Sequence, residues 1–280
     1  MPLLKHLNDF VTLFVDTLKQ MGRWRVWLVL GVYVLIGWLL LYVHYKALSP
    51  VLYGTVKFWT SLFGEEASNR FFHYPGQFFY LSYFFGWAKL IMAVVLEGLF
   101  LGTTISLFRS AFSGGELRIG ASLRSQVAVW VHLIGVSVIF NALITLAGML
   151  LPILFAPWIT GYARRTLAFD FVFMPFVFTV LLSLFYFAIP SVAIRRLSIW
   201  RAIGRSLRTF ARRPFTCFFM SGLILAAPVL LAATADRADF IISKLRPELM
   251  YWLLLAGLLA EMIANFFWMG TAARFMAEEE

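Results

Sequence analysis

Six stretches of this chain are each about 20 residues or longer and almost free of charged side chains. A helix of about 20 apolar residues crosses the roughly 30 Å hydrocarbon core of a bilayer. The sequence therefore predicts an all-α fold: a polytopic membrane helical bundle with six transmembrane helices. These helices are expected at residues 24–45, 77–108, 126–156, 167–194, 215–234 and 249–272.

The overall composition favours a membrane protein over a soluble one. Hydrophobic residues make up 61% of the chain and charged residues 14%, and the mean hydropathy is +0.83. These values are far too apolar for a soluble domain. The net charge of +10 is typical of some nucleic-acid-binding proteins, but here the basic residues lie in short loops beside apolar stretches. Anionic lipid explains that distribution, so we expect phospholipid partners and no nucleic acid.

The longest charged run, residues 195–214, lies between two apolar stretches and contains seven arginines and no acidic residue. Over 198–212, apolar and basic residues recur at helical spacing on two different faces. This pattern predicts an amphipathic helix on the membrane surface, with Trp200 and the arginines as a candidate surface for lipid or a protein partner. The alternative is a loop whose charges only orient the protein. The apolar face consists of Trp200, Ile203, Leu207 and Phe210, and the basic face of Arg201, Arg205, Arg208 and Arg212.

Two further segments are expected at the membrane surface. Within residues 1–22, an apolar stripe that includes Phe10 and Phe14 opposes a charged face, which indicates an interfacial helix over 3–21. Acidic residues interrupt this region and no cleavage site follows it, so we expect it to be retained. Residues 51–66 are too short and too polar to cross the bilayer, and they are expected to be interfacial or re-entrant.

The distribution of basic residues predicts the topology. With six spans, fifteen lysines and arginines fall on the side of the two termini and eight on the opposite side. Because basic residues concentrate in cytoplasmic loops, both termini and the 195–213 connector are expected in the cytoplasm. We interpret residues 1–280 as a single integral membrane domain in the cytoplasmic (inner) membrane of a bacterium.

A short internal repeat suggests duplication. IGASLR at 119–124 and IGRSLR at 203–208 match at five of six positions and lie 84 residues apart. Each lies between a preceding and a following span. The repeat predicts a duplicated helix–connector–helix unit within residues 80–234.

The same region carries a family resemblance. IG-x-SL at 203–207 is followed by RRP at 212–214 and a last helix that ends in GTAARF at 270–275. This order, over residues 80–277, resembles bacterial six-helix inner-membrane proteins related to the membrane domain of some glycerophosphodiester phosphodiesterases. The family's usual asparagine before the connector proline is Arg213 here, and no phosphodiesterase domain is recognisable. The resemblance therefore implies a six-helix fold, but it does not imply a catalytic activity.

The second and sixth predicted spans carry ionisable residues. Such residues cost at least about 2.5 kcal/mol at membrane depth, so they should face the bundle interior. Lys89 and Glu97 lie two helical turns apart, about 12 Å along the axis, so each needs another partner. Glu261 and Asn265 share one face of the sixth span. These four residues form a candidate intramembrane polar site, in which the carboxyl groups either hold helices together or carry protons or cations.

Small residues accompany both polar stripes. Gly98 and Gly102 lie beside the polar face of the second span, and Gly257 and Ala260 beside that of the sixth. Because small residues allow close helix approach in membranes, these two spans are predicted to pack through them.

Few residues indicate covalent or metal chemistry. None of the common hydrolase, nucleotide-binding or paired-cysteine motifs occurs, and the four histidines are scattered. Cys217 is the single cysteine, which excludes an internal disulfide. Asp170 follows Arg165 closely enough for a local ion pair. We expect no enzymatic activity, no metal and no cofactor.

The leading functional hypothesis is a non-enzymatic membrane-embedded accessory or scaffold subunit. It would act through its basic cytoplasmic connectors on anionic lipid or on a partner, most readily another membrane protein. The alternative is a transporter or channel for a small solute, ion or lipid that uses the ionisable residues of the second and sixth spans.

Overall fold

The computed structural model describes residues 2–278, and regular structure in this part of the chain is entirely helical. Six helical units are long and apolar enough to cross a membrane, which confirms the predicted all-α bundle. The chain is therefore a multi-pass membrane protein. Residue 1, at the start of the predicted interfacial segment, and residues 279–280 lie outside the described residues.

The six spanning units follow the predicted stretches closely. The last unit is longer than predicted, with 30 residues or about 45 Å of helix, so its final turns extend beyond a hydrocarbon core of about 30 Å. The spans are α2 (Trp24–Tyr45), α5–η1–α6 (Gly76–Met92, Ala93–Glu97, Gly98–Phe112), α8 (Trp130–Ile159), α9–η2–α10–α11 (Ala163–Ala168, Phe169–Phe173, Met174–Phe185, Ala188–Arg195), α13 (Pro214–Ala235) and α15 (Leu249–Glu278).

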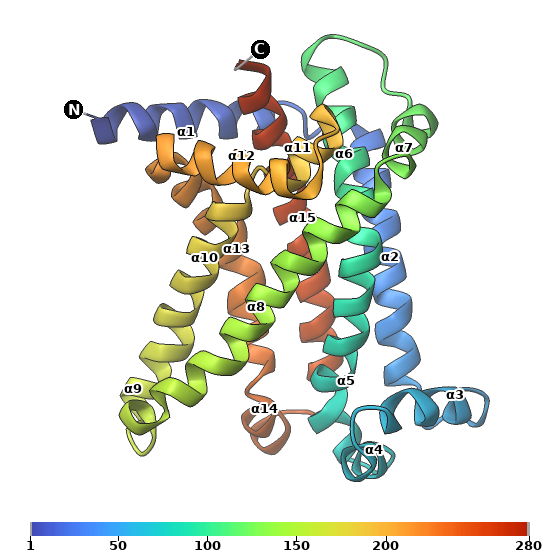
Figure 1. Ribbon diagram of the computed structural model, residues 1–280. Helices are drawn as coiled ribbons and strands as arrows, with labels where there is room; N and C mark the ends of the chain where they lie inside the picture. The colour runs from blue at the N-terminus through green and yellow to red at the C-terminus, as the bar shows by residue number, and fades with distance from the viewer. Residues whose placement is uncertain (1, 279–280) are drawn as a thin grey trace.

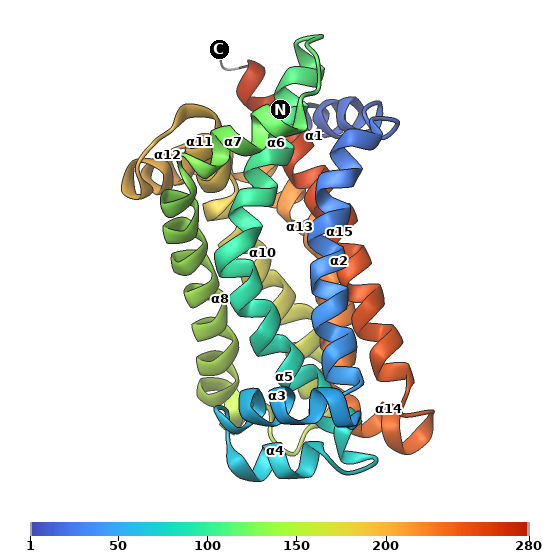
Figure 2. The same ribbon diagram turned by 90° about the vertical axis from the view of Figure 1, so that its right-hand side faces the viewer.

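Short helices cover both ends of the bundle (Figure 1). Both chain termini lie at one end, termed the terminal end, together with α1 (Pro2–Leu18), α7 (Ile119–Val127) and α12 (Ile199–Arg212). The opposite, distal end carries α3 (Pro50–Ser61), α4 (Glu65–Phe71) and α14 (Ala238–Lys244), as well as α9. Figure 2 shows α3 lying across this end. Of the two alternatives for residues 51–66, the structure therefore favours the interfacial one.

The helix α15 is the centre of the bundle and packs against α2, α6, α13 and α1. Near the terminal end, the Tyr186 hydroxyl and the Thr271 hydroxyl share a hydrogen bond of 2.5 Å, and Trp268 Nε1 donates to the Tyr186 carbonyl at 3.0 Å. The Trp27 ring stacks on Phe266 with centroids 4.2 Å apart. Because these polar groups are paired, they stabilise the buried contact between α15 and its neighbours.

The interfacial helix α1 is attached to α15 by an aromatic contact and an ion pair. Phe14 stacks on Phe267 with centroids 4.6 Å apart, and Arg274 Nε donates to the Asp16 carboxylate at 3.0 Å. The hydrogen bond from Lys19 at 2.9 Å, together with Arg274, holds the pKa of Asp16 below its usual value. Asp16 therefore stays ionised and joins α1 to the last turns of α15.

The glycines of the second span face other neighbours than predicted. A Cβ atom on Gly98 would lie 2.9 Å from the Leu133 Cβ of α8, and one on Gly102 would lie 2.8 Å from Gln126 Oε1 of α7. A Cβ on Gly257 would meet nothing within 4 Å among the described residues. The predicted contact between the second and sixth spans is confirmed, because α15 packs against α5 and α6. The prediction that Gly98 and Gly102 make this contact with Gly257 and Ala260 is wrong. Spacing shows where a helix can be approached closely but not which neighbour approaches it.

The two repeated segments lie in α7 and α12, both at the terminal end (Figure 1). Their equivalent serines pack differently, because Ser206 is fully buried while Ser122 is only partly buried. Instead, α7 is held by Gln126, whose Nε2 donates to Ser106 Oγ at 2.8 Å. The two segments thus share a location but not a set of contacts, and the duplication stays a prediction.

Candidate functional site

The basic helix α12 lies across the terminal end of the bundle (Figure 1). Its buried residues are Ala202, Ile203, Ser206 and Thr209, so the face toward the bundle is mostly small. Ser206 Oγ donates to the Leu184 carbonyl at 2.6 Å, which ties α12 to the fourth span. A fixed buried face determines which residues α12 presents outward.

The outward surface of α12 differs from the predicted apolar face. Trp200 is 76% exposed and Leu207 is 42% exposed, whereas Ile203 is buried against the bundle. Residues 200 and 207 lie seven positions apart and share one face, roughly 120° from the buried centre of the helix. The single predicted stripe is therefore two faces, one toward protein and one available to the lipid interface.

The arginines occupy the third face of α12. Arg201, Arg208 and Arg212 are exposed, and Arg205 is partly buried. Three of these arginines line a polar hollow of about 330 Å³ together with Thr209. Because guanidinium groups bind phosphate in a bidentate manner, this face is suited to anionic headgroups.

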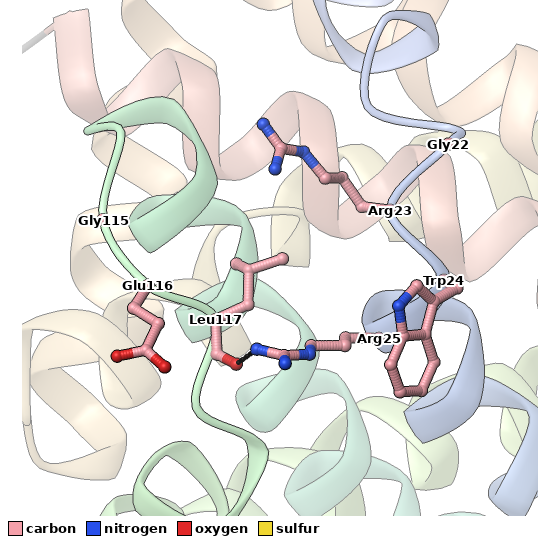
Figure 3. A pocket seen from close by; sticks show the side chains of 7 residues that line it. All are labelled: Gly22, Arg23, Trp24, Arg25, Gly115, Glu116 and Leu117. Carbon is pink, nitrogen blue, oxygen red and sulfur yellow. Dashed lines mark hydrogen bonds between the residues drawn. The ribbon is translucent and has the colours of Figure 1, made fainter.

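A second polar hollow, of about 380 Å³, lies where α2 begins and is lined by two arginines and by Glu116 (Figure 3). Arg25 reaches across to the segment before α7, where its Nη1 donates to the Leu117 carbonyl at 2.6 Å. The side chain of Arg23 lines another side of the hollow, and the Trp24 ring is 63% exposed beside it. In the sequence, Arg23 and Arg25 contributed only to the count of basic residues that predicts the topology. They line a hollow because residues 115–117 lie opposite them, and residue spacing does not predict where that connector lies.

Within the bundle, Lys89 of α5 forms an ion pair with Glu261 of α15. Their side chains are 31% and 26% exposed. The sequence identified both residues and required a partner for each, but it did not identify the pair. Because α5 and α15 are adjacent, the structure brings the two charges together at membrane depth.

Glu97 lies close to this pair without a hydrogen bond to it among the described residues. It is partly buried and within electrostatic range of Lys89 and Glu261. Glu97 ends the π-helical turn η1, a local distortion that is frequent at functional sites. Tyr33 is 4% exposed and within electrostatic range of both carboxyl groups. Sequence reasoning missed Tyr33 because nothing distinguishes it from the chain's many other aromatic residues.

Asn265 belongs to the predicted polar set but stands apart from the ion pair. It lies on α15 one turn closer to the terminal end than Glu261 and is 7% exposed. No hydrogen bond among the described residues joins it to Lys89 or Glu261. The structure thus brings together three of the four predicted residues, Lys89, Glu97 and Glu261.

Asp170 pairs with Arg237 of the segment after α13, and not with Arg165 as predicted. The Arg165 guanidinium instead lies over the Tyr162 ring, 4.1 Å from its centroid. The predicted local pair is therefore wrong, because Asp170 lies in the π-helical turn η2 and is turned toward α13. Asp170 and Arg237 line a cavity of about 310 Å³.

Among the described residues, no group of three His, Cys, Asp or Glu side chains is placed to hold a metal ion. No family model, no curated protein and no solved structure matches this chain.

Proposed function

We propose that this protein is a non-enzymatic accessory or scaffold subunit that holds anionic phospholipid at its terminal end, next to a partner membrane protein. The observation that supports this proposal is the three-faced arrangement of α12. Its buried face is fixed to the bundle, its arginines form an outward basic face, and Trp200 and Leu207 form an exposed apolar third face. Each basic residue near an anionic surface contributes about 1 kcal/mol of attraction.

The exposed side of α8 offers a surface for the partner along the bundle, and it begins at the terminal end, where Val131 is 76% exposed. The distal half of this helix packs little against the rest of the chain, and Ile153, Leu154 and Trp158 are 69%, 67% and 72% exposed. In a membrane this surface contacts either lipid or another helix bundle.

Removing the four charges of the basic face should reduce anionic lipid binding at least tenfold, because four residues at about 1 kcal/mol each together exceed the roughly 1.4 kcal/mol of one decade. The protein is purified in mild detergent, and co-purified phosphatidylglycerol and cardiolipin are quantified by mass spectrometry. Equal lipid loss from both variants, or none from either, would contradict the proposal. The test variant has Gln at Arg201, Arg205, Arg208 and Arg212, and the control has Gln at Arg164, Arg165, Lys244 and Arg246 of the distal end.

We further propose that the membrane is the bacterial cytoplasmic membrane and that the terminal end is cytoplasmic. In a Cys217→Ala background, a cysteine at Ser198 should not react with an impermeant maleimide added to intact cells. A cysteine at Phe58 of α3, which is 71% exposed, should react. This labelling pattern is expected because basic segments are retained in the cytoplasm. The reverse pattern would show that the orientation is inverted.

The alternative function is transport of a proton, cation or small solute past Lys89, Glu97 and Glu261. The observation that favours it is the third ionisable group, Glu97, beside an ion pair at membrane depth. Ionisable residues inside a membrane often mark ion pathways. In this case Glu97 would exchange a proton or bind a cation while Lys89 and Glu261 stay paired.

A further inference from the structure

An apolar groove of about 510 Å³ runs along the side of the bundle toward the distal end. One wall is α2 from Ile36 to His44, and the other is the second span from Ala88 to Leu96. Each wall spans nine residues, or about 12 Å of helix between its end residues. At the distal end, Trp59 and neighbouring residues of α3 close the groove. Its volume falls within the range of about 300–1,000 Å³ that is typical of ligand sites.

The groove is open toward the lipid. Ile91 and Val95 of the second span line it and are 49% and 37% exposed. No charged side chain is among the residues that line it. Lys57 of α3 forms a hydrogen bond with Asn69 and does not line the groove. A molecule that enters from the bilayer therefore meets hydrocarbon walls.

Polarity along the groove matches that of a lipid. His44 lies one residue before the end of α2, at the membrane surface, while Ile36 and Leu96 lie deeper. The polar atoms of the groove are thus at its distal, interfacial end. A lipid of the distal leaflet would enter with its head beside α3 and its chain between the two spans.

His44 offers an unused hydrogen-bond acceptor in this groove. It is 3% exposed, and its Nδ1 lies 2.7 Å from the Leu40 carbonyl, which only accepts. Nδ1 must therefore carry the proton, and in a neutral imidazole Nε2 is an acceptor. Nε2 is buried and has no hydrogen-bond partner among the described residues. An unpaired buried polar atom is unfavourable, so a ligand that donates to it would be favoured.

Trp59 supplies the complementary group. Its indole Nε1, a donor only, is likewise buried without a partner. A hydroxyl group both donates and accepts, so an alcohol can satisfy the two kinds of unpaired atom that this groove contains. A phosphate or carboxylate head would bring a charge for which the lining residues provide no counter-ion.

We propose that this groove binds a neutral lipid alcohol, such as a monoacylglycerol. Its chain lies between α2 and the second span, and its hydroxyl donates to His44 Nε2 and accepts from the Trp59 indole. This site is at the opposite end from α12 and differs from it chemically, because it selects an uncharged hydroxyl over an anion.

The test uses the full-length protein in nanodiscs and a monoolein analogue with a photoreactive diazirine near the end of its acyl chain. Labelled peptides are quantified by mass spectrometry. With this hydroxyl probe we expect label in residues 36–43 and 88–96. A matching ether probe, in which the hydroxyls are methylated, should give about fivefold less label, because it loses one hydrogen bond. His44→Phe should reduce labelling by the hydroxyl probe about fivefold and leave the ether probe unchanged. Ala88→Phe should block both probes by filling the groove.

Ile153→Phe on the exposed face of α8 is the matched control and should label like the unmodified protein. Equal labelling by the hydroxyl and ether probes would overturn the proposal, since any apolar chain would then suffice. Competition by phosphatidylglycerol as strong as by monoolein would also overturn it, because an ordinary leaflet phospholipid would be the occupant. If His44→Phe does not fold, Trp59→Phe is measured instead. It should reduce labelling by both probes, because a hydroxyl and an ether oxygen both accept from the indole, and unchanged labelling by both probes refutes the proposal.

Discussion

Gly270→Leu is expected to destabilise the protein by about 3 kcal/mol or more, which corresponds to a fall of roughly 10 °C in melting temperature. At this position Thr17 of α1 packs directly against the backbone of α15. A Cβ on Gly270 would clash with Thr17 Cγ2 of α1 and would lie 3.1 Å from Phe108 Cζ of α6. Neither neighbour can move away easily, because Thr17 donates to the Leu13 carbonyl at 2.8 Å and Phe108 is fully buried. Thermal unfolding in detergent, followed by circular dichroism, measures the effect.

Gly257 provides the control on the same helix. A Cβ there would meet nothing within 4 Å among the described residues, so Gly257→Leu should leave stability within about 1 kcal/mol. Gly270→Ala should show a smaller loss than Gly270→Leu. Thr17→Ser removes the clashing methyl group and should restore part of the stability of Gly270→Ala. Equal losses at both glycines would show that α1 does not pack on α15 in this way.

The spans could be predicted because membrane crossing depends on length and hydropathy alone. Trp24–Tyr45 and Pro214–Ala235 are read directly from uninterrupted apolar runs. The neighbours of each span could not be predicted in the same way. Gly98 and Gly102 form a surface that any neighbouring helix could approach closely. In the structure, the helices that approach it are α8 and α7. Inside lipid, burial of apolar surface does not select a partner, so contact shape decides.

The candidate site was predictable to a similar extent. Charged residues are rare in the spans, so Lys89 and Glu261 were conspicuous, and the structure pairs them. The orientation of α12 was less accessible, because Trp200 and Ile203 both look apolar at helical spacing. Only the small buried face around Ser206 shows that Trp200 points away from the protein. The lipid site proposed at His44 depends on a ring nitrogen without a hydrogen-bond partner among the described residues, and no sequence pattern indicates such an atom.

Lys89→Met is expected to cost about 3 kcal/mol of stability, and Glu261→Gln clearly less. Removal of one partner from a buried ion pair leaves an uncompensated charge in a poorly solvating environment. The two changes are not equivalent, because Glu97 lies within electrostatic range of Lys89. Without Glu261, Lys89 still has one carboxylate nearby. Without Lys89, two carboxyl groups face each other with no cation.

The double variant Lys89→Met with Glu261→Gln should recover most of the loss, since no charge remains unpaired apart from Glu97. Arg118→Met is the control: its exposed pair with Glu116 should contribute less than about 1 kcal/mol. Equal losses in both single variants, or no recovery in the double, would contradict this account of the cluster.

Glu97→Gln then distinguishes proton transport from a purely structural role of the cluster. If the protein carries protons, reconstituted vesicles should lose proton flux while the melting temperature is unchanged. If Lys89, Glu97 and Glu261 only hold helices together, vesicles with the unmodified protein should show no proton flux above protein-free vesicles, and Glu97→Gln should change neither this flux nor anionic lipid binding at α12, because that surface lies at the terminal end and shares no residue with the cluster.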